Sequence, residues 1–409
     1  MPGHVTSSTM TKFLGHVDAD CYYVSAERVR HHCLRGVPCG VLSNQGACVI
    51  AKSYELKAHG VTTAMPIWDA VPLCPDAVFV KRDFRWYEIL SRKMLGIIRE
   101  VSPKVEFYSI DEMFFEADNW GIDEARELQQ RVMQSVGVPV SIGIAKTKTL
   151  AKLASDLAKP FGCFTATTEE DQRRLIENVP ITEVTGIARR SAIKLARHNI
   201  TTCDQLAAAY PPAIRKLLTV KGEQLLLELR GERCYPIGEK REANKALARG
   251  GTLGGASRDP AKVFGWAYRN TERLIEALDR HLQWAERLTL SISFREGGGI
   301  SRRATLPEAT NDFHLLTTAA TDLLDQCWPR SLHVAYMHVV ADRLSPRAYR
   351  QRGLFVRQTD PRVAEVKKQL NDKIGRFALR TAETLPLVDQ YNDSTNDYDI
   401  CDVYGKTCF

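Results

Sequence analysis

The sequence predicts a multidomain α+β protein, and three observations lead to this fold class. In residues 1–172, apolar strand-like runs with acidic residues at their ends alternate with helical stretches. Residues 173–233 contain only short helical stretches, and from Lys245 the order of elements is β-α-β-β-α-β. A chain of 409 residues is also too long for one ordinary core, so roughly two to four domains are expected.

Composition narrows the class of protein. With 44% hydrophobic and 26% charged residues, the chain is typical of a water-soluble globular protein. It has no apolar run of about 18 residues that could span a membrane. The polar start, Met1 to Gly15, has no apolar signal-peptide core, so we expect a cytoplasmic protein. The 11 cysteines are scattered without a CxxC pair, which indicates reduced thiols rather than disulfides or zinc ligands.

The net charge of +7 is unevenly distributed along the chain. Residues 1–172 are slightly acidic, whereas the excess of basic residues lies between residues 173 and 350. A cationic middle region is where a polyanion such as DNA would bind. A solvated basic surface explains the same charge equally well, so charge alone does not decide the function.

Individual elements follow from apolar patterns and helix breakers. The expected strands of the first part are Phe13–Asp18, a run from Val105 to Phe115, and Val138–Ile144. The expected helices are Glu88–Val101, Asp123–Val136 and Leu150–Ala158, the last one stopped by Pro160. Cys234–Asn244 is polar and contains Pro and Gly, which is typical of a linker.

The second part supplies the β-α-β-β-α-β pattern of a split βαβ sandwich. After a strand that begins near Lys245, the expected elements are helix Pro260–Trp284, strands Arg287–Phe294 and Ile300–Leu306, helix Asp312–Trp328 and strand His333–Ala341. The remaining tail has one amphipathic helical stretch, Pro361–Ile374, and a polar, Asp/Asn-rich end.

Three carboxylates stand out at the ends of the expected strands. Asp18 ends the first strand, and the pair Asp111-Glu112 interrupts the second apolar run. Burying three carboxylates together is unfavourable unless cations neutralise them. Two Mg²⁺ ions that clamp the attacking and leaving oxygens of a phosphoryl transfer are one solution. Each acidic residue could also end its strand in solvent, and Asp18 taken alone favours that simpler reading.

Four ordered motifs resemble those of the Y-family translesion DNA polymerases. They are HVDADCYYVSAE (His16–Glu27), VLSNQGACVIAKSYELKAHGV (Val41–Val61), YSIDEMFFE (Tyr108–Glu116) and GIAKTKTLAKLASDLAKP (Gly143–Pro160). Within the family, the second motif is most similar to the UmuC branch, the catalytic subunit of bacterial DNA polymerase V. The resemblance covers roughly residues 13–355.

The resemblance implies a right-hand polymerase with palm, small fingers, helical thumb and little finger. The implied domains are residues 1–27 and 84–172 for the palm, 28–83 for the fingers, 173–233 for the thumb, 234–244 for a linker, 245–345 for the little finger and 346–409 for a C-terminal tail. It also implies two Mg²⁺ ions held by Asp18, Asp111, Glu112 and the backbone carbonyl of Ala19.

The family pattern further implies a nucleotide-binding site. Tyr23 would be the steric gate, an aromatic wall under the sugar that rejects a 2′-hydroxyl, although a core aromatic is the simpler reading of a lone Tyr. Tyr54, Lys57 and Lys159 would neutralise the triphosphate of a dNTP. Many family members carry Arg at the position of Lys57, and Lys lacks the bidentate fork of Arg.

Primer-template DNA would contact two other regions. Residues Ile181–His198 resemble a helix-hairpin-helix, in which Gly186 and Ala188 stand in the hairpin and backbone amides face a phosphate. The usual Gly-Ile-Gly core ends here in Ala188, and a left-handed backbone costs Ala more than Gly. In the little finger, the candidate phosphate contacts are Arg249, Arg258, Arg295, Arg302 and Arg303.

The resemblance implies low-fidelity translesion synthesis without proofreading, in DNA repair and the SOS response. The implied partners are a sliding clamp, bound through Gln351, Leu354 and Phe355 of the motif at residues 351–355, and a UmuD-like dimer and RecA. Two alternatives remain. A non-catalytic adaptor of a repair complex would typically lack Asp18, Asp111 and Glu112, and a palm-fold nucleotide cyclase would need neither a thumb nor a clamp motif.

Overall fold

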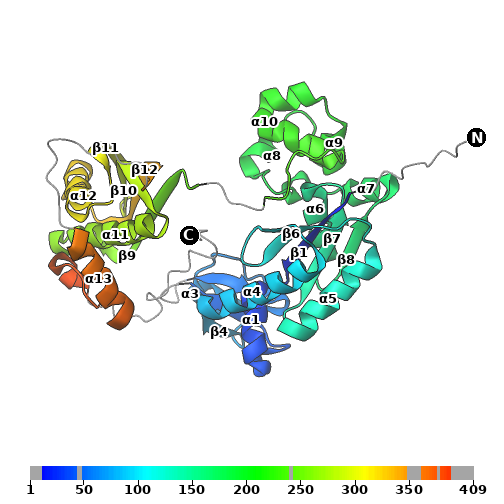
Figure 1. Cartoon of the computed structure of the whole chain (residues 1–409), viewed down its shortest axis with the longest axis horizontal. Helices are drawn as coiled ribbons and strands as arrows, with labels where there is room; N and C mark the ends of the chain where they lie inside the picture. Colours follow the sequence, from blue (N-terminus) through cyan, green and yellow to red (C-terminus); the bar gives the residue numbers. More distant parts are fainter. Residues whose placement is uncertain (1–11, 44–47, 239–242, 348–360, 375–377, 388–409) are drawn as a thin grey trace, which may run out of the picture. The chain divides into compact units, whose positions relative to one another are not determined.

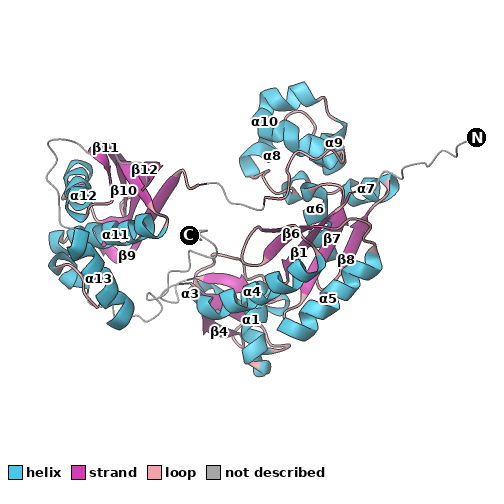
Figure 2. Cartoon of the chain, viewed as in Figure 1, coloured by secondary structure: helices cyan, strands magenta, loops and turns pink. Residues whose placement is uncertain are grey.

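The computed structural model describes residues 12–43, 48–238, 243–347, 361–374 and 378–387 (Figure 1). These residues form two compact units, one on each side of the segment 239–242. Both units mix helices and strands, as Figure 2 shows, so the predicted α+β class is confirmed. Within the described residues we find no helix that combines the length and the apolar character needed to cross a membrane.

The first unit is built on a five-stranded sheet with the order β5-β6-β1-β7-β8. Its strands are β1 (Leu14–Ala19), β5 (Val105–Phe107), β6 (Glu112–Glu116), β7 (Val140–Ala145) and β8 (Cys163–Ala166). β1 pairs antiparallel with β6 and β7, whereas β7 and β8 are parallel. The three apolar runs predicted from the sequence therefore meet in one sheet, with β1 at its centre.

One expected strand is divided in the structure. The run from Val105 to Phe115 forms two antiparallel strands, β5 and β6, joined by a tight turn. In this turn the amides of Tyr108 and Ser109 both donate to the carbonyl of Glu112, at 3.1 and 3.0 Å. The sequence does not reveal this turn, because the buried Ile110 within the turn continues the apolar run.

Helices α4 (Phe84–Val101), α5 (Ile122–Val136) and α6 (Lys148–Ala158) pack around this sheet. α6 joins β7 to β8 and contacts β1, β7 and β8. Gly143 of β7 allows this close packing, because a Cβ there would lie 2.1 Å from the carbonyl oxygen of Ala151 in α6. His16 of β1 faces the same helix, since its Nδ1 lies 2.7 Å from the hydroxyl of Ser155.

A smaller three-stranded sheet was not predicted from the sequence. It has the order β3-β2-β4 and consists of β2 (Cys39–Leu42), β3 (Val49–Lys52) and β4 (Val78–Lys81), with helices α2 (Tyr54–Ala58) and α3 (Ile67–Leu73). Its strands have four residues each, too few to show a clear alternation of apolar and polar residues. α1 (Tyr22–Arg30) contacts this sheet as well as α4.

Residues 169–229 form a helical cluster, as the sequence predicts. Its elements are α7 (Glu169–Ile176), η3 (Ile181–Glu183), α8 (Arg189–Ala196), α9 (Cys203–Ala208) and α10 (Pro211–Leu229). They share one apolar core with the inner side of α6.

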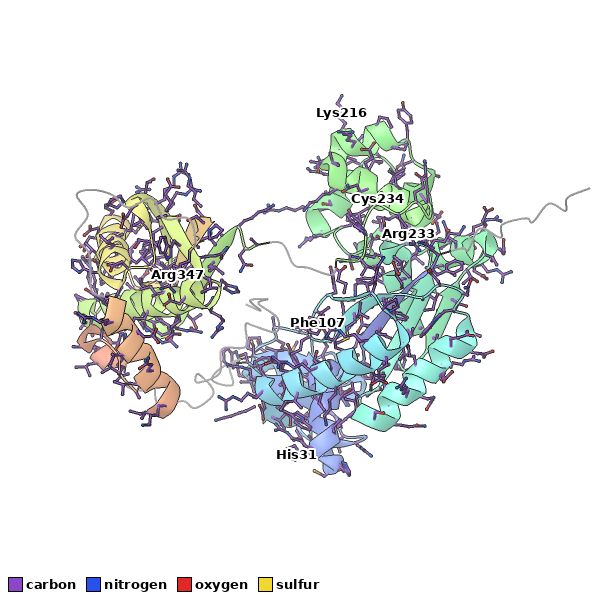
Figure 3. The ribbon with its side chains drawn as sticks, in the orientation of Figure 1. His31, Phe107, Lys216, Arg233, Cys234 and Arg347 are labelled. Carbon is purple, nitrogen blue, oxygen red and sulfur yellow. The ribbon has the colours of Figure 1, made fainter. Side chains whose placement is uncertain are left out.

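The end of α10 is joined to the start of α6 by the carboxylate of Glu228, which is 0% exposed. Its Oε1 accepts from the amides of Cys234 and Tyr235 at 2.7 and 3.1 Å, and its Oε2 accepts from the amide of Thr149 at 3.0 Å. Next to it, Nε of Arg233 donates to the carbonyl of Lys146 at 2.7 Å. These hydrogen bonds, the Glu228 joint, fix the helical cluster next to the N-terminus of α6. Figure 3 labels Arg233 and Cys234 at this joint.

The second unit contains the predicted β-α-β-β-α-β order. Its elements are β9 (Ala246–Ser257), α11 (Pro260–Arg280), β10 (Gln283–Phe294), β11 (Gly299–Thr310), α12 (Phe313–Cys327) and β12 (Val334–Pro346). The strand order is β11-β10-β12-β9, so β12 lies between β9 and β10, the two strands that α11 connects. This is the split arrangement expected from the sequence.

The sheet of the second unit has one covered and one open face. Leu288, Leu290 and Ile292 of β10 are buried in a core with α11 and α12. Thr289 and Ser291 alternate with them and therefore belong to the opposite face. Since cross-strand partners share a face, Arg303 (opposite Thr289) and His338 (opposite Ser291) lie on that open face too.

The C-terminal segment contributes to the same unit. Helix α13 (Pro361–Ile374) has the bounds predicted from the sequence, and Nζ of Lys367 in it lies 2.6 Å from the carboxylate of Glu272 in α11. The 3₁₀ helix η4 (Ala382–Leu387) packs on α11, and Leu387 is 2% exposed within the core. The polar, Asp/Asn-rich end predicted from the sequence lies outside the described residues.

Candidate active site

The three predicted acidic residues lie at one end of the central strand. In the pairing of β1 with β6, Asp18 stands directly opposite Glu112. The amide of Ala19 donates to the carbonyl of Asp111 at 3.0 Å, which fixes the turn residue Asp111 beside the strand. The sequence distance between Asp18 and the Asp111-Glu112 pair is therefore closed by backbone pairing, and the side chains of Asp18 and Glu112 share the face that α6 covers.

Two lysines, Lys152 of α6 and Lys159 at the C-cap of this helix, accompany these carboxylates. Nζ of Lys152 lies 2.7 Å from Oε1 of Glu112 and 3.7 Å from Oδ2 of Asp18. Nζ of Lys159 lies 2.7 Å from Oδ2 of Asp18 and 3.0 Å from Oδ1 of Asp156. Lys152, Asp156 and Lys159 follow the spacing i, i+4, i+7, so they lie along one side of the helix.

Burial shapes the protonation of this cluster. Burial raises the pKa of Asp18 to about 7, against the opposing effect of the Lys159 charge. Burial also raises the pKa of Asp111 above the ordinary value of an aspartate. Burial opposes ionisation of Glu112 as well, but the neighbouring His16 and Lys152 lower its pKa to about 2. The site thus holds one firmly ionised carboxylate and two whose charge is costly, so added positive charge would stabilise all three.

Metal ligation itself depends on how the donors are grouped. The three acids supply the hard oxygen donors that Mg²⁺ prefers. Across the parts of the chain described here, however, no three His, Cys, Asp or Glu side chains are drawn together as a preformed metal-binding group. The carboxylate oxygens of Asp18 and Glu112 are directed to Lys152 and Lys159, so ion binding would require these lysines to give way.

Asp20, which the sequence analysis did not single out, connects three elements of the site. Its Oδ2 accepts from the amide of Phe161 at 2.7 Å, and its two oxygens accept from the hydroxyl of Ser141 at 3.0 and 3.2 Å. The hydroxyl of Tyr54 donates to its Oδ1 at 3.4 Å. Asp20 is 2% exposed, and burial raises its pKa. This carboxylate ties β7, the turn after Lys159 and the start of α2 together.

The predicted nucleotide-binding residues differ in their surroundings. Tyr54 is 36% exposed at the start of α2 and reaches the site through Asp20. Lys159 lies inside the carboxylate cluster, as described above. Lys57 is an exposed residue of α2. The structure therefore brings Tyr54 and Lys159 to the carboxylates, whereas it gives no contact that links Lys57 to them.

Tyr23 lies on α1, five residues after Asp18, with a half-buried ring. The ring stacks on that of Tyr87 of α4, with centroids 4.8 Å apart and planes at 17°. Phe84 packs edge-on against Tyr23, at 5.4 Å and 87°. The partial exposure of the ring is compatible with the predicted role under a sugar.

The predicted helix-hairpin-helix is only partly helical. Its first helix is a single 3₁₀ turn, η3, and its second is α8. Gly186 has the positive φ of 103° that favours glycine, whereas Ala188 has φ −81° and ψ 169°. Ala188 is therefore extended rather than left-handed, and the substitution of Ala for Gly creates no strain at this position.

The five arginines of the second unit that the sequence analysis proposed as phosphate contacts are not equivalent. Arg249 is 5% exposed and stands opposite Val339, on the face covered by the helices. Arg303 is exposed on the open face, and Arg302, opposite the buried Leu290, is exposed on the outer strand β11. Arg258 and Arg295 are exposed outside the strands. Burial makes Arg249 the least suitable DNA contact. The motif residues Gln351, Leu354 and Phe355 lie outside the described residues.

Comparisons with known proteins identify the family of the chain. Residues 17–156 match the impB/mucB/samB family, and residues 244–354 match the impB/mucB/samB family C-terminal domain. The chain is 30% identical to DNA polymerase IV of Desulfatibacillum aliphaticivorans, over 91% of this chain and 96% of the relative. It is 29% identical to the protein UmuC of Salmonella typhimurium, over 88% of this chain and 91% of the relative.

A solved structure extends the likeness to three dimensions. A Y-family DNA polymerase chimera of Dbh and Dpo4 superposes with a TM-score of 0.69 at 21% sequence identity, over 82% of this chain and 99% of the chimera. The chain therefore has the fold of a right-hand polymerase. It belongs to the impB/mucB/samB family, the Y family of translesion DNA polymerases. Relatives called polymerase IV and UmuC match at nearly equal identity, so assignment to the UmuC branch stays a prediction.

Three residues of the site escaped the sequence analysis: Lys152, Asp20 and Tyr87. The spacing of Lys152 from Lys159, two turns along one helix, was a usable signal for a shared cationic edge. Asp20 stands inside the first quoted motif, two residues after Asp18, but nothing in the sequence shows what it binds. Tyr87 belongs to a separate helix, and only the fold brings it to Tyr23.

Proposed function

We propose that the chain catalyses template-directed transfer of dNTPs to a primer 3′-hydroxyl and serves in translesion synthesis. The observation that carries this proposal is the pairing of Asp18 on β1 with Glu112 on β6, beside Asp111, in a member of the Y family. DNA polymerase activity is what this family membership supports. Synthesis past damaged bases, with low fidelity and without proofreading, is the part that we propose for this chain.

Asp18, Asp111 and Glu112, with the backbone carbonyl of Ala19, would hold two Mg²⁺ ions. The raised pKa values of Asp18 and Asp111 support this assignment, because they mark a site in which positive charge is favourable. When bound, such ions activate the 3′-hydroxyl and neutralise the leaving pyrophosphate. The chain's own contribution is to hold these residues at one strand end, through β1–β6 pairing for Asp18 and Glu112 and through the Ala19 amide for Asp111.

Lys159, Tyr54 and Lys57 would bind the triphosphate. The ammonium of Lys159 is within 2.7 Å of Asp18 and so stands where phosphate oxygens would approach the carboxylates. The hydroxyl of Tyr54 is held near the same place by Asp20. Lys57 would contribute long-range attraction from the exposed surface of α2. Tyr23 would lie under the deoxyribose as the steric gate.

We further assign the parts of the hand. The five-stranded sheet with its helices would be the palm, within residues 1–27 and 84–172, and the three-stranded sheet would be the fingers, within residues 28–83. The helical cluster would be the thumb, residues 173–233, with Gly186 and Ala188 facing a DNA phosphate. The second unit would be the little finger, residues 245–345, and Arg302 and Arg303 would contact the DNA backbone rather than the buried Arg249.

Partners follow from the same proposal. A sliding clamp would bind Gln351, Leu354 and Phe355, in the Gln-x-x-Leu-Phe pattern of the motif at residues 351–355. A UmuD-like dimer and RecA, and with them a place in the SOS response, rest on the predicted UmuC branch alone. We expect all of these partners in the cytoplasm.

A primer-extension assay with the purified full chain tests the proposal. The substrates are Mg²⁺, the four dNTPs and a primed template that is either undamaged or carries an abasic site. We expect extension of both templates, dependence on the template sequence, and no 3′-exonuclease activity on a mismatched primer. Binding of the primed template without any extension would overturn the polymerase assignment in favour of an adaptor. Conversion of nucleoside triphosphates without DNA would favour a cyclase.

A further inference from the structure

The ring of Tyr87 forms the back of the predicted steric gate. It covers one face of the Tyr23 ring in a parallel stack, with centroids 4.8 Å apart and planes at 17°. Phe84 stands edge-on to both rings, 5.4 Å from Tyr23 and 5.5 Å from Tyr87. Tyr87 is 0% exposed, so it cannot touch a nucleotide itself.

Tyr87 is in turn fixed at its hydroxyl. The hydroxyl donates to Oε1 of Glu27 at 2.7 Å, and Glu27 is 1% exposed. Arg30 grips that carboxylate with Nε and Nη2, at 2.9 and 2.8 Å. Its Nη1 also donates to Asp83, the N-cap of α4, at 2.7 Å. A closed set of charge-assisted hydrogen bonds therefore anchors Tyr87 between α1 and α4.

A wall discriminates against a larger substrate only if it cannot move away. A Tyr ring turns about two side-chain bonds, and a neighbour stacked on one face blocks the movement that would open space under the sugar. Tyr87 belongs to α4 and covers the face of the Tyr23 ring that is turned toward this helix. The stack therefore resists displacement of the Tyr23 ring toward α4.

We propose that Tyr87 is a specificity-determining residue, which positions Tyr23 and thereby sets the discrimination between dNTPs and rNTPs. The proposal rests on the proposed role of Tyr23 as steric gate. Tyr87 acts through Tyr23 and not on the substrate, so it is a positioning residue. Removing its ring should relax sugar selection while leaving incorporation of dNTPs almost unaltered.

The experiment measures kcat/KM for one dNTP and the matching rNTP with the full-length chain on the same primed template. In Tyr87→Leu we expect the dNTP-to-rNTP ratio to fall by about tenfold, the scale of one lost aromatic pair. Tyr87→Phe keeps the stack and loses only the hydroxyl, so it should retain most of the ratio. Tyr87→Met gives a second variant without an aromatic ring, in case the Leu variant does not fold.

Phe115→Leu is the matched control, because Phe115 is also 0% exposed in the same unit but packs against Trp120. It should leave the ratio unchanged. The double variant Tyr23→Ala/Tyr87→Leu should select sugars no worse than Tyr23→Ala alone, since both changes act on one wall.

Two different failures can be told apart. If Tyr23→Ala lowers the ratio but folded Tyr87→Leu and Tyr87→Met keep the wild-type ratio, the role of Tyr87 is refuted and the gate stands. If Tyr23→Ala itself keeps the wild-type ratio, the gate assignment fails and the role of Tyr87 with it. If Phe115→Leu lowers the ratio as much as Tyr87→Leu does, the effect comes from loosened packing of the unit, and the specific role of Tyr87 is refuted.

Discussion

Lys159 at the end of α6 places its ammonium 2.7 Å from Oδ2 of Asp18 at the end of β1. The two residues are joined in space because α6 runs back over the sheet after β7, and Gly143 lets it lie close. This contact joins a predicted metal ligand to a predicted phosphate-binding residue. Variants that change the charge of this cluster therefore test both predicted roles.

Conversion of the turn carboxylates to amides tests the catalytic core. Asp111→Asn combined with Glu112→Gln keeps the shape of the site but removes two negative charges. We expect primer extension to fall by roughly 10³-fold or more, because the metal-binding donors are lost. Affinity for primed DNA, measured by fluorescence anisotropy, should stay within about twofold, since phosphate contacts dominate that affinity. Extension at the wild-type rate would remove these residues from the active site.

Removal of the Lys152 ammonium should strengthen cation binding. Lys152 lies 2.7 Å from Glu112 and 3.7 Å from Asp18, so it would compete with the proposed Mg²⁺ for their oxygens. In Lys152→Met we expect a lower melting temperature without Mg²⁺, and half-maximal restoration at about tenfold less Mg²⁺ than the wild type needs. Differential scanning calorimetry over a Mg²⁺ series measures both effects. Lys148→Met on the same helix is the control, because Lys148 pairs with Glu106 instead. Equal Mg²⁺ dependence in the two variants would argue against an ion at these carboxylates.

Asp20→Asn should weaken nucleotide binding more than catalysis. The substitution replaces one acceptor oxygen by an amide, so the contacts to Phe161, Ser141 and Tyr54 cannot all be kept. We expect the KM for dNTPs to rise about tenfold while kcat changes little. Ser141→Ala removes one of the three donors and should have a smaller effect. A higher Mg²⁺ requirement at unchanged KM would instead identify Asp20 as a metal ligand.

The joint at Glu228 can be examined amide by amide. In Glu228→Gln the new NH₂ group faces backbone donors, which costs about 1–3 kcal/mol for each buried group left without a partner. Hydrogen exchange should therefore accelerate at the amides of Thr149, Cys234 and Tyr235, which donate hydrogen bonds to this carboxylate. The exposed Glu232 offers a matched control, and Glu232→Gln should leave these amides protected. Unchanged protection in Glu228→Gln would mean that this joint does not hold the helical cluster.

The clamp motif can be tested through stimulation of synthesis. Replacing Leu354 and Phe355 by Ala should abolish the stimulation by a sliding clamp and leave clamp-free extension as it was. Gln358→Ala, just outside the motif, is the comparison variant. An equal loss of synthesis with and without the clamp would point to a folding effect rather than to a lost contact.

Much of this architecture follows from local sequence patterns. The runs at Phe13–Asp18 and Val138–Ile144 are apolar enough to be buried strands, and they form neighbours in the sheet. The elements of the second unit were predictable because their strands are long and their helices strongly amphipathic. The three-stranded sheet was not, since its strands have four residues each and depend on their tertiary neighbours.

The sequence could predict which acidic residues meet at the candidate site but not the contacts of their neighbours. Family motifs single out Asp18, Asp111 and Glu112, and the pairing of β1 with β6 explains how they meet. Sequence cannot tell that Arg249 points to the covered face of its sheet, because this depends on a one-residue register. Nor can the sequence show that Tyr87 supports Tyr23. The two residues belong to α1 and α4, and the strands of the three-stranded sheet lie between these helices along the chain.

The docking of η4 has a consequence for how residues 351–355 meet a partner. β12 ends at Pro346, and both α13 and η4 are attached to α11 of the same unit. The described residues on either side of residues 348–360 thus belong to one folded unit. Since the motif proposed to bind a clamp lies in this connection, we expect inserted glycines between residues 347 and 360 to change clamp-stimulated synthesis, because the length of the connection sets the local concentration of the motif at the clamp.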